Sequence, residues 1–186
     1  MSEVQETAGI CCSKTVKKIL LGVAVTLLLG GGIVWTTICP CETMPGFVLL
    51  GESPVDPVTD WGFANDVSLC QIQVSFALRP HSVNVNCMAT PDGKLYISCS
   101  TFDNKYWCPR VGEDQAGRLR LDGVVYPVLL NREMGQSALD RIWAARIQKL
   151  QKPAVQARQP GGGGEPPSLD TPRPDSWGSF HVVSRS

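Results

Sequence analysis

Residues 98–105 carry side chains that suit a phosphate-bearing ligand. Ser98, Ser100 and Thr101 lie at the end of a predicted β-strand, and Asn104-Lys105 follows shortly after them. Hydroxyl groups donate hydrogen bonds to phosphate oxygens, and a lysine ammonium adds positive charge. This order of residue types indicates a nucleotide-like ligand.

Two stretches on either side of a turn must hold these side chains in place. In each stretch apolar residues alternate with polar ones, which is typical of a β-strand with one buried face. Pro91-Asp92-Gly93 between them predicts a tight turn, because glycine adopts the positive φ that such turns require. The apolar positions are Val83, Val85 and Cys87 in the first stretch and Leu95, Ile97 and Cys99 in the second.

An apolar stretch near the N-terminus predicts where this hairpin lies in the cell. Residues 19–38 contain no charged side chain. At about 1.5 Å per residue, a helix of this length spans the hydrocarbon core of a bilayer. Three lysines lie within residues 14–18, whereas the first charge after the stretch is Glu42. This lysine bias places residues 1–18 in the cytoplasm and the globular part on the extracytoplasmic (periplasmic) side of a single-pass membrane protein.

A cleaved signal peptide is the alternative interpretation of this stretch. The lysines and the apolar run fit the first two regions of a signal peptide. However, the exit sequence Trp35-Thr36-Thr37-Ile38 lacks the small residues of a cleavage site. The apolar run is also longer than the usual core of a signal peptide. The sequence therefore favours an uncleaved membrane anchor.

The composition limits the class of protein. The chain has 186 residues and a formal net charge of zero, and no cluster of Lys and Arg occurs beyond the membrane flank. A dedicated nucleic-acid-binding protein carries a basic patch, so the sequence argues against this class. Roughly 145 residues follow the span, enough for one small domain with its own core.

The eight cysteines divide between the membrane flanks and the globular part. The globular part is expected in a compartment where disulfides persist. Even so, Cys70, Cys87 and Cys99 lie on the apolar faces of predicted strands, and this burial favours free thiols. The offset of Cys87 and Cys99 across the hairpin argues against a direct bond between these two residues.

A metal site is not predicted. Cys39 and Cys41 form a close pair, but no second close pair follows, and the two histidines, His81 and His181, are far apart in the chain. A zinc site needs more ligands at a recognisable spacing. We interpret the Cys39–Cys41 pair as structural or incidental.

The remaining patterns predict a small antiparallel split β-barrel. After a linker at 39–60, residues 61–186 form the domain, with a flexible Pro/Gly-rich loop at 152–175. Pro127 removes a hydrogen-bond donor, so its strand is expected at a sheet edge or with a bulge. Five or six strands with one or two helices predict a mainly β fold. Besides the hairpin, strands are expected at 69–76, 118–121, 124–130 and 176–185.

One segment changes from the strand period to the helical period. In residues 137–150 the apolar side chains recur at helical spacing and gather on one face. The polar residues, Lys149 among them, are expected on the opposite face, in solvent. This helix precedes the last predicted strand.

In their order and spacing, these elements resemble the pyridoxamine 5′-phosphate oxidase-like, FMN-binding split barrel proteins. The resemblance covers roughly two thirds of the chain, from about residue 61 onward. It rests on Arg79-Pro80-His81-Ser82-Val83, the turn and strand of residues 91–97, Asn104-Lys105, residues 118–126 and the closing residues 176–185.

The resemblance implies a homodimer that holds FMN between its subunits. In the family, the first strand of the hairpin contacts the flavin ring and phosphate, and the end of the second strand and a lysine beyond it reach the phosphate. Taken alone, the lysine is also typical of a solvated surface residue, and the histidine of one that hydrogen-bonds at a strand end. The matching residues of this chain are His81, Ser82, Asn84, Ser98, Cys99, Asn104 and Lys105.

The resemblance leaves more than one function open. We expect a membrane-anchored, flavin-dependent oxidoreductase with an unknown small-molecule substrate, in which the cofactor carries the chemistry and the protein orients it. The alternative is a cofactor-free, membrane-tethered barrel that acts as a binding or assembly module. A third interpretation is a split barrel that binds another cofactor, such as haem or a deazaflavin. The first is favoured because the order of elements is kept where the cofactor would lie.

Overall fold

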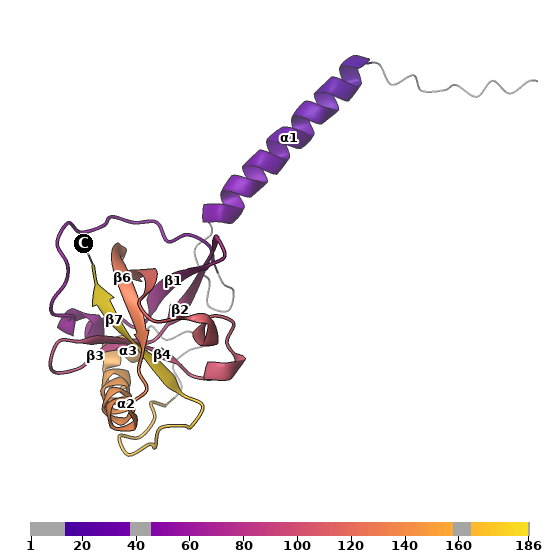
Figure 1. The fold of residues 1–186 in the computed structure, drawn as a ribbon. Coiled ribbons are helices and arrows are strands. Elements are labelled where there is room, and N and C mark those ends of the chain that lie inside the picture. Colours follow the sequence, from indigo (N-terminus) through magenta and orange to yellow (C-terminus); the bar gives the residue numbers. More distant parts are fainter. Residues whose placement is uncertain (1–13, 38–45, 158–164, 186) are drawn as a thin grey trace, which may run out of the picture. The chain divides into compact units, whose positions relative to one another are not determined.

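The structure is a computed structural model, and it describes residues 14–37, 46–157 and 165–185. The chain divides into two compact units between Thr36 and Thr37, and we describe each unit by itself. The first unit is one helix and the second is a β-domain (Figure 1).

The helix of the first unit is α1, Lys14–Thr37, with 24 residues. Its segment Val16–Ile33 has a mean hydropathy of 1.8, and no part of this segment is buried within the protein. By length and composition, α1 is able to cross a membrane. It begins earlier than the predicted start at Ile19, because lysine is a good helix former and the flanking lysines extend the helix.

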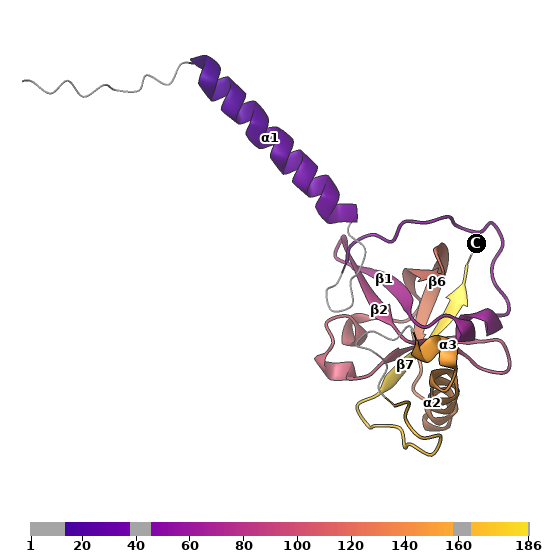
Figure 2. The ribbon, with the colours of Figure 1, turned by 180° about the vertical axis from the view of Figure 1, so that it is seen from behind.

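The second unit contains one antiparallel sheet of seven strands, which curls into a half-barrel (Figures 1 and 2). The strand order across the sheet is β2-β1-β5-β6-β7-β4-β3. This mainly β architecture confirms the predicted fold class. The strands are β1 Cys70–Phe76, β2 Arg79–Val85, β3 Cys87–Ala89, β4 Leu95–Cys99, β5 Gln115–Leu121, β6 Val124–Arg132 and β7 Gly178–Ser184.

The connection between β2 and β3 explains the curl of the sheet. These strands lie at opposite edges of the sheet, yet only Asn86 separates them in the chain. The two edges must therefore approach each other, and the carbonyl of Asn86 accepts a hydrogen bond from the N–H of Ser98 in β4 at 2.9 Å. The prediction of one continuous strand here is wrong, because the chain passes from one edge to the other at Asn86.

Pro127 lies in an interior strand, and its predicted position at an edge or a bulge is wrong. β6 runs between β5 and β7, and Arg118 pairs with Pro127 in a continuous register. The pairing of β6 with β7 begins one residue later, at Val128. The Pro127 carbonyl accepts a hydrogen bond from the N–H of Arg185 at 3.0 Å. The proline nitrogen faces the same side, just past the end of the paired ladder, so its missing N–H is tolerated.

The helix α2, Gln136–Leu150, confirms the predicted helical segment. It packs against β3 and β7, and its residues Leu139 and Ile142 form a buried cluster with Met88 and Trp177. Lys149 was expected in solvent, but only 3% of its surface is exposed. That prediction is wrong, because the end of α2 also contacts the chain around residue 64, so the helix buries more than one face. The main core lies inside the half-barrel and includes Ile72, Leu95, Ile97, Leu119, Leu130 and Phe180.

Two disulfides close the half-barrel, where free thiols were expected. Cys70 in β1 bonds to Cys87 in β3, with Cα atoms 5.9 Å apart, and Cys99 in β4 bonds to Cys108, with Cα atoms 6.6 Å apart. The predicted burial of the three strand cysteines is confirmed, as is the absence of a Cys87–Cys99 bond. The first disulfide forms because the curl of the sheet places β1 beside the start of β3. The second forms because the loop after β4 returns to this strand at residue 108.

The segment expected as a linker is attached to the sheet from residue 46 onward. Gly46 exchanges two backbone hydrogen bonds with Ser82, at 2.8 and 3.0 Å. The N–H of Leu49 donates to the side-chain oxygen of Gln73 at 2.7 Å, and Leu49 is fully buried. Four short helices complete the unit: η1 Gly62–Asp66, η2 Phe102–Asn104, η3 Cys108–Arg110 and α3 Pro153–Gln156.

The loop predicted at 152–175 is described in two parts. The first part contains α3, and the second part contacts α2 through the indole N–H of Trp143, which donates to the carbonyl of Thr171 at 2.7 Å. Arg173 in the second part pairs with Asp140 of α2. The glycines 161–164 lie outside the described residues.

Candidate functional site

The structure places the seven residues expected at a flavin site on three elements. His81, Ser82 and Asn84 lie on β2, and Ser98 and Cys99 lie on β4. Asn104 ends η2, and Lys105 follows it.

Four of these residues are engaged with the surrounding scaffold. Ser82 is fully buried, and its backbone pairs with Gly46. The side-chain oxygen of Asn84 accepts a hydrogen bond from the amide of Gln71 at 3.0 Å. The remaining two lie on β4: the hydroxyl of Ser98 donates to a backbone carbonyl at 3.3 Å, and Cys99 forms a disulfide. These contacts explain how the four residues support the fold.

The other three residues, His81, Asn104 and Lys105, lie close to the surface, and His81 contacts an aromatic ring. The ring of His81 is 5.0 Å from the ring of Tyr106, the residue after Lys105. Lys105 and Asn104 are exposed. Partial burial lowers the pKa of His81, and the positive charge of Arg79 lowers it further. Near neutral pH this histidine is therefore mainly an uncharged hydrogen-bonding group.

Further basic residues surround this pair. The guanidinium of Arg110 lies 4.2 Å from the centre of the Tyr106 ring, and it also donates to the Tyr106 carbonyl at 2.5 Å. Arg79 is exposed at the start of β2. We call the residues Arg79, His81, Lys105, Tyr106 and Arg110 the basic–aromatic cluster.

The basic–aromatic cluster is suited to an anion. Within the described part of the chain, none of its three cations forms an ion pair with a carboxylate. Tyr106 keeps 49% of its surface exposed, so its ring is accessible. Uncompensated positive charge attracts anions, and an exposed aromatic ring offers a face for stacking. The cluster therefore combines the two groups that a phosphorylated ring compound requires.

Sequence reasoning found only part of this cluster. Trp107, the residue after Tyr106, is buried in the core, with 4% of its surface exposed. Tyr106 and Arg110 were missed as members of a site. The spacing of Tyr106 and Arg110 around the short helix η3 is the signal that could have revealed them, because one helical turn brings such residues together.

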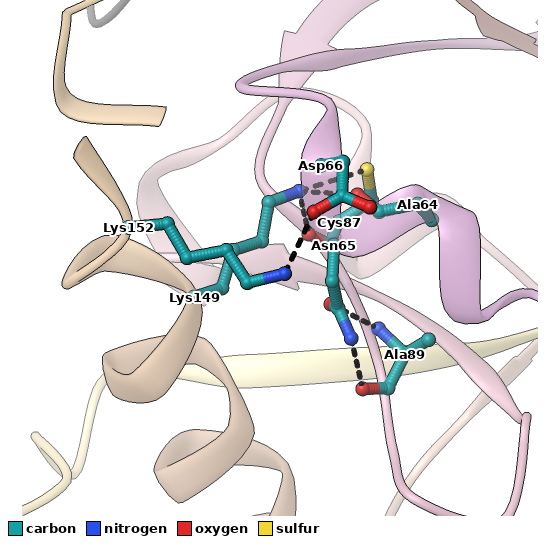
Figure 3. A network of polar contacts seen from close by, with 7 residues as sticks. All are labelled: Ala64, Asn65, Asp66, Cys87, Ala89, Lys149 and Lys152. Carbon is teal, nitrogen blue, oxygen red and sulfur yellow. Dashed lines mark hydrogen bonds and ion pairs between the residues drawn. The ribbon is translucent and has the colours of Figure 1, made fainter. Parts of the chain in front are cut away.

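The structure also reveals a polar network that the sequence did not predict (Figure 3). The ammonium of Lys149, near the end of α2, donates to the carbonyl of Ala64 at 2.8 Å and to that of Cys87 at 2.5 Å. Its nitrogen also lies 3.6 Å from the sulfur of Cys87. These contacts join α2, η1 and the edge strand β3.

Two neighbouring side chains complete this network. The side-chain NH₂ group of Asn65 donates to the carbonyl of Ala89, and the side-chain oxygen of Asn65 accepts from the N–H of Ala89, each at 2.9 Å. These two bonds satisfy backbone groups at the edge of β3 that a neighbouring strand would otherwise pair with. Lys152 forms an ion pair with Asp66 at 2.7 Å (Figure 3). Both partners of this pair are exposed, so it contributes little to stability.

Lys149 is an unusual lysine, because its partners carry no charge. Burial, together with the nearby charge of Lys152, lowers the pKa of Lys149 to about 7, against the opposing effect of the Asp66 carboxylate. Lysine is almost never fully buried unless it is paired with a carboxylate. Lys149 also lines a cavity of about 310 Å³, which we call the Lys149 cavity. Its wall includes Asp60, Asn65, Thr90, Gln148, Lys149 and Lys152.

Metal binding has no support in the described residues. No group of three or more potential metal-ligating side chains occurs there. Cys39 and Cys41 lie outside the described residues.

The comparisons with known proteins returned no match. No protein-family model, no curated protein and no solved structure is similar enough to this chain to be matched.

Proposed function

We propose that this protein is a membrane-anchored split barrel that binds a phosphorylated ring compound of the FMN type at the basic–aromatic cluster. When bound, a flavin supplies hydride or electron-pair transfer, so the proposed activity is that of a flavin-dependent oxidoreductase. We further propose that α1 anchors the chain and that the half-barrel lies on the extracytoplasmic side.

The observation that carries the proposal is a set of exposed cations without carboxylate partners around an exposed aromatic ring. Arg79, Lys105 and Arg110 are available for phosphate oxygens, and arginine suits such recognition because its planar fork bonds two oxygens at once. Tyr106 and the neighbouring His81 offer ring faces. The basic–aromatic cluster fits a phosphorylated ring compound. Ser82, Asn84, Ser98 and Cys99 take part in the scaffold, and we do not assign them to the ligand site.

The two disulfides support the proposed side of the membrane. Structural disulfides persist in oxidising compartments and are rare in the cytosol. Both bonds lie in the half-barrel, and the lysines that favour a cytoplasmic location lie at the opposite end of α1. A thiol-reactive, membrane-impermeant probe on a cysteine introduced at Leu78, which is fully exposed, would locate the domain.

Retention of FMN by the purified full chain in detergent tests the proposal. After incubation with FMN and desalting, the wild-type protein should keep the flavin absorbance bands. The double variant Arg79→Gln/Lys105→Gln should lose them, because it removes two of the cations that bind phosphate. Lys94→Gln is the matched control: it removes one exposed charge outside the cluster and should retain FMN. Equal flavin retention by all three proteins would contradict the proposed site.

The oligomeric state is part of the same proposal. The resemblance implies that the flavin lies between two subunits, so the FMN-loaded chain should be a homodimer. Light scattering coupled to gel filtration measures this directly. If the protein retains FMN as a monomer, FMN binding is supported, but a flavin site shared between two subunits is contradicted.

A cofactor-free binding or assembly module is the second candidate. The observation that favours it is the engagement of four expected flavin residues in scaffold contacts. A folded protein that shows no flavin absorbance after incubation with FMN would support this candidate over the first.

A further inference from the structure

The turn between β1 and β2 presents an apolar side chain in an unfavourable backbone conformation. Ala77 and Leu78 form this two-residue turn with φ values of 47° and 68°. Asn and Gly are the usual residues in such turns, because most other side chains are strained at positive φ. Leu78 is also fully exposed. Burial within the β-domain therefore does not explain a leucine at this position.

Cationic and aromatic side chains lie next to this turn. Arg79 follows the turn directly, and its guanidinium lies 5.8 Å from the centre of the Phe47 ring. Phe76, which pairs with Arg79 across the hairpin, contacts the ring of Tyr106, with the ring centres 5.9 Å apart. This contact brings Lys105, the neighbour of Tyr106 in the chain, to the same end of the hairpin. We use the name tip surface for Leu78, Arg79, Lys105 and Tyr106.

The tip surface combines the groups that bind proteins to a membrane surface. Leu78 supplies an apolar side chain, and Tyr106 supplies an exposed amphipathic ring of the kind enriched at the level of lipid head groups. Arg79 and Lys105 are exposed, and neither forms an ion pair with a carboxylate in the described part of the chain. Their charges therefore remain available to anionic head groups.

The covalent chain limits how far this surface lies from the end of α1. Residues 38–45 connect Thr37, the last residue of α1, to Gly46. Gly46 is paired with β2, and the ring of the next residue, Phe47, lies beside Arg79. Even at full extension the connection reaches at most about 30 Å. The chain thus enters the β-domain beside the tip surface, and no other part of the tip-surface hairpin is tethered more closely to α1.

We propose that the tip surface docks on the anionic phospholipid surface of the bilayer that α1 spans. Leu78 enters the head-group region, where a water-soluble probe still reaches residue 78, and Arg79 and Lys105 bind lipid phosphates. The inference rests on the proposed anchoring by α1, but it does not rest on flavin binding. Lipid phosphates and FMN would share these two cations, so the test is made without FMN.

Methyl NMR of the full chain in nanodiscs tests this docking. The chain carries ¹³C-labelled leucine methyl groups, and the nanodiscs contain phosphatidylcholine, phosphatidylglycerol and a lipid with a gadolinium chelate on its head group. Leu78 should lose about threefold more signal intensity than Leu169, because only Leu78 lies among the head groups. Leu169 is the control, since it is also exposed and belongs to the segment that contacts α2.

The electrostatic part of the docking is tested separately. Nanodiscs without phosphatidylglycerol, or an increase in salt from about 0.1 to about 0.5 M, should reduce the excess loss at Leu78. Arg79→Gln/Lys105→Gln should have the same effect in anionic nanodiscs, whereas Lys94→Gln, which removes an exposed charge outside the tip surface, should have none. An excess loss at Leu78 that none of these changes reduces would overturn the binding of lipid phosphates.

Leucines of α1 distinguish failure of the docking from failure of the anchor. Leu27, Leu28 and Leu29 lie in the apolar segment of α1, so their signals should weaken when the helix is in the bilayer. If they weaken while Leu78 behaves like Leu169, the docking is overturned and the anchor stands. If neither the α1 leucines nor Leu78 weaken, the anchor is overturned and the docking with it.

Discussion

The β-domain holds basic residues in two very different settings. In the basic–aromatic cluster, Arg79, Lys105 and Arg110 are exposed and form no ion pair with the carboxylates of the described chain. In the network around α2, Lys149 is buried and donates to uncharged carbonyls. The first setting keeps positive charge in water, where it attracts anions. The second disfavours the charged form, because burial lowers the pKa of the lysine.

The difference shows that the surroundings of a basic residue decide its chemistry. Lys149 and Lys152 are three residues apart in the chain, yet Lys152 pairs with Asp66 in solvent, whereas no carboxylate in the described part of the chain forms an ion pair with Lys149. Burial therefore lowers the pKa of Lys149. The two regions should therefore respond to different perturbations.

The largest expected effect is the loss of the disulfide beside Lys149. Cys70→Ala/Cys87→Ala should lower the free energy of unfolding by about 3 kcal/mol, because the bond closes a loop across 17 residues and restricts the unfolded chain. Chemical denaturation of the full chain in detergent, followed by tryptophan fluorescence, measures this. Cys99→Ala/Cys108→Ala is the control and should cost less, because its loop spans 9 residues. The Cys70→Ala/Cys87→Ala protein should still retain FMN. Loss of FMN by this variant would show that the basic–aromatic cluster depends on the region around this disulfide.

Removal of the buried amine should have the next largest effect. Lys149→Met keeps the length of the side chain but leaves the carbonyls of Ala64 and Cys87 without their donor, at a cost of about 2 kcal/mol. The matched control Lys152→Met, which loses only an exposed ion pair, should leave the denaturation midpoint unchanged. If Lys149→Met and Lys152→Met lost the same amount of stability, the network would stabilise the protein through surface charge.

The stability of the protein should also depend on pH through Lys149. Its pKa is lowered to about 7 in the folded state, from an ordinary value of 10.5. Between these values the unfolded chain binds more protons than the folded chain, so stability rises with pH. The gain from pH 7 to pH 9 should be about 2 kcal/mol. It should be absent in Lys149→Met, and parallel pH profiles for the two proteins would show that Lys149 is charged when folded.

The smallest expected effect concerns the surface cluster. Arg110→Gln removes the cation that lies over Tyr106, and it should weaken FMN binding about threefold to tenfold. The thermal midpoint should stay within error of the wild type, because the residue is exposed. Fluorescence quenching of FMN gives the affinity, with Lys94→Gln as the control. A drop in stability without a change in affinity would assign Arg110 to the scaffold.

Much of the fold follows from local sequence pattern. Alternation predicted the strand that ends at Phe76, and the two strands on either side of residues 122–123 and the helix after Gly135 were also placed correctly. Each of these signals lies within a few residues, so it can be recognised without knowledge of the rest of the chain.

The errors arose where distant segments meet. The alternation of apolar and polar residues continues through Asn86, but the strand does not. The approach of the two sheet edges, and not the local period, decides where β2 ends. The pairing of Cys70 with Cys87 depends on the same closure. Lys149 looks like the solvent face of a helix, and only the position of η1 shows that a second surface covers it. His81 and Lys105 were expected at the candidate site from the sequence, whereas Arg110, at the end of η3, was not.

The basic–aromatic cluster and the network around Lys149 should respond independently, and one measurement on a single sample tests this. Full-length protein with ¹³C-labelled lysine side chains is titrated by NMR, first with pH and then with FMN. We expect the Lys149 signal to titrate near pH 7 and not to respond to FMN, whereas the Lys105 signal should shift when FMN is added. A Lys149 signal that titrates with the surface lysines near pH 10, or FMN shifts that do not include Lys105, would contradict the account.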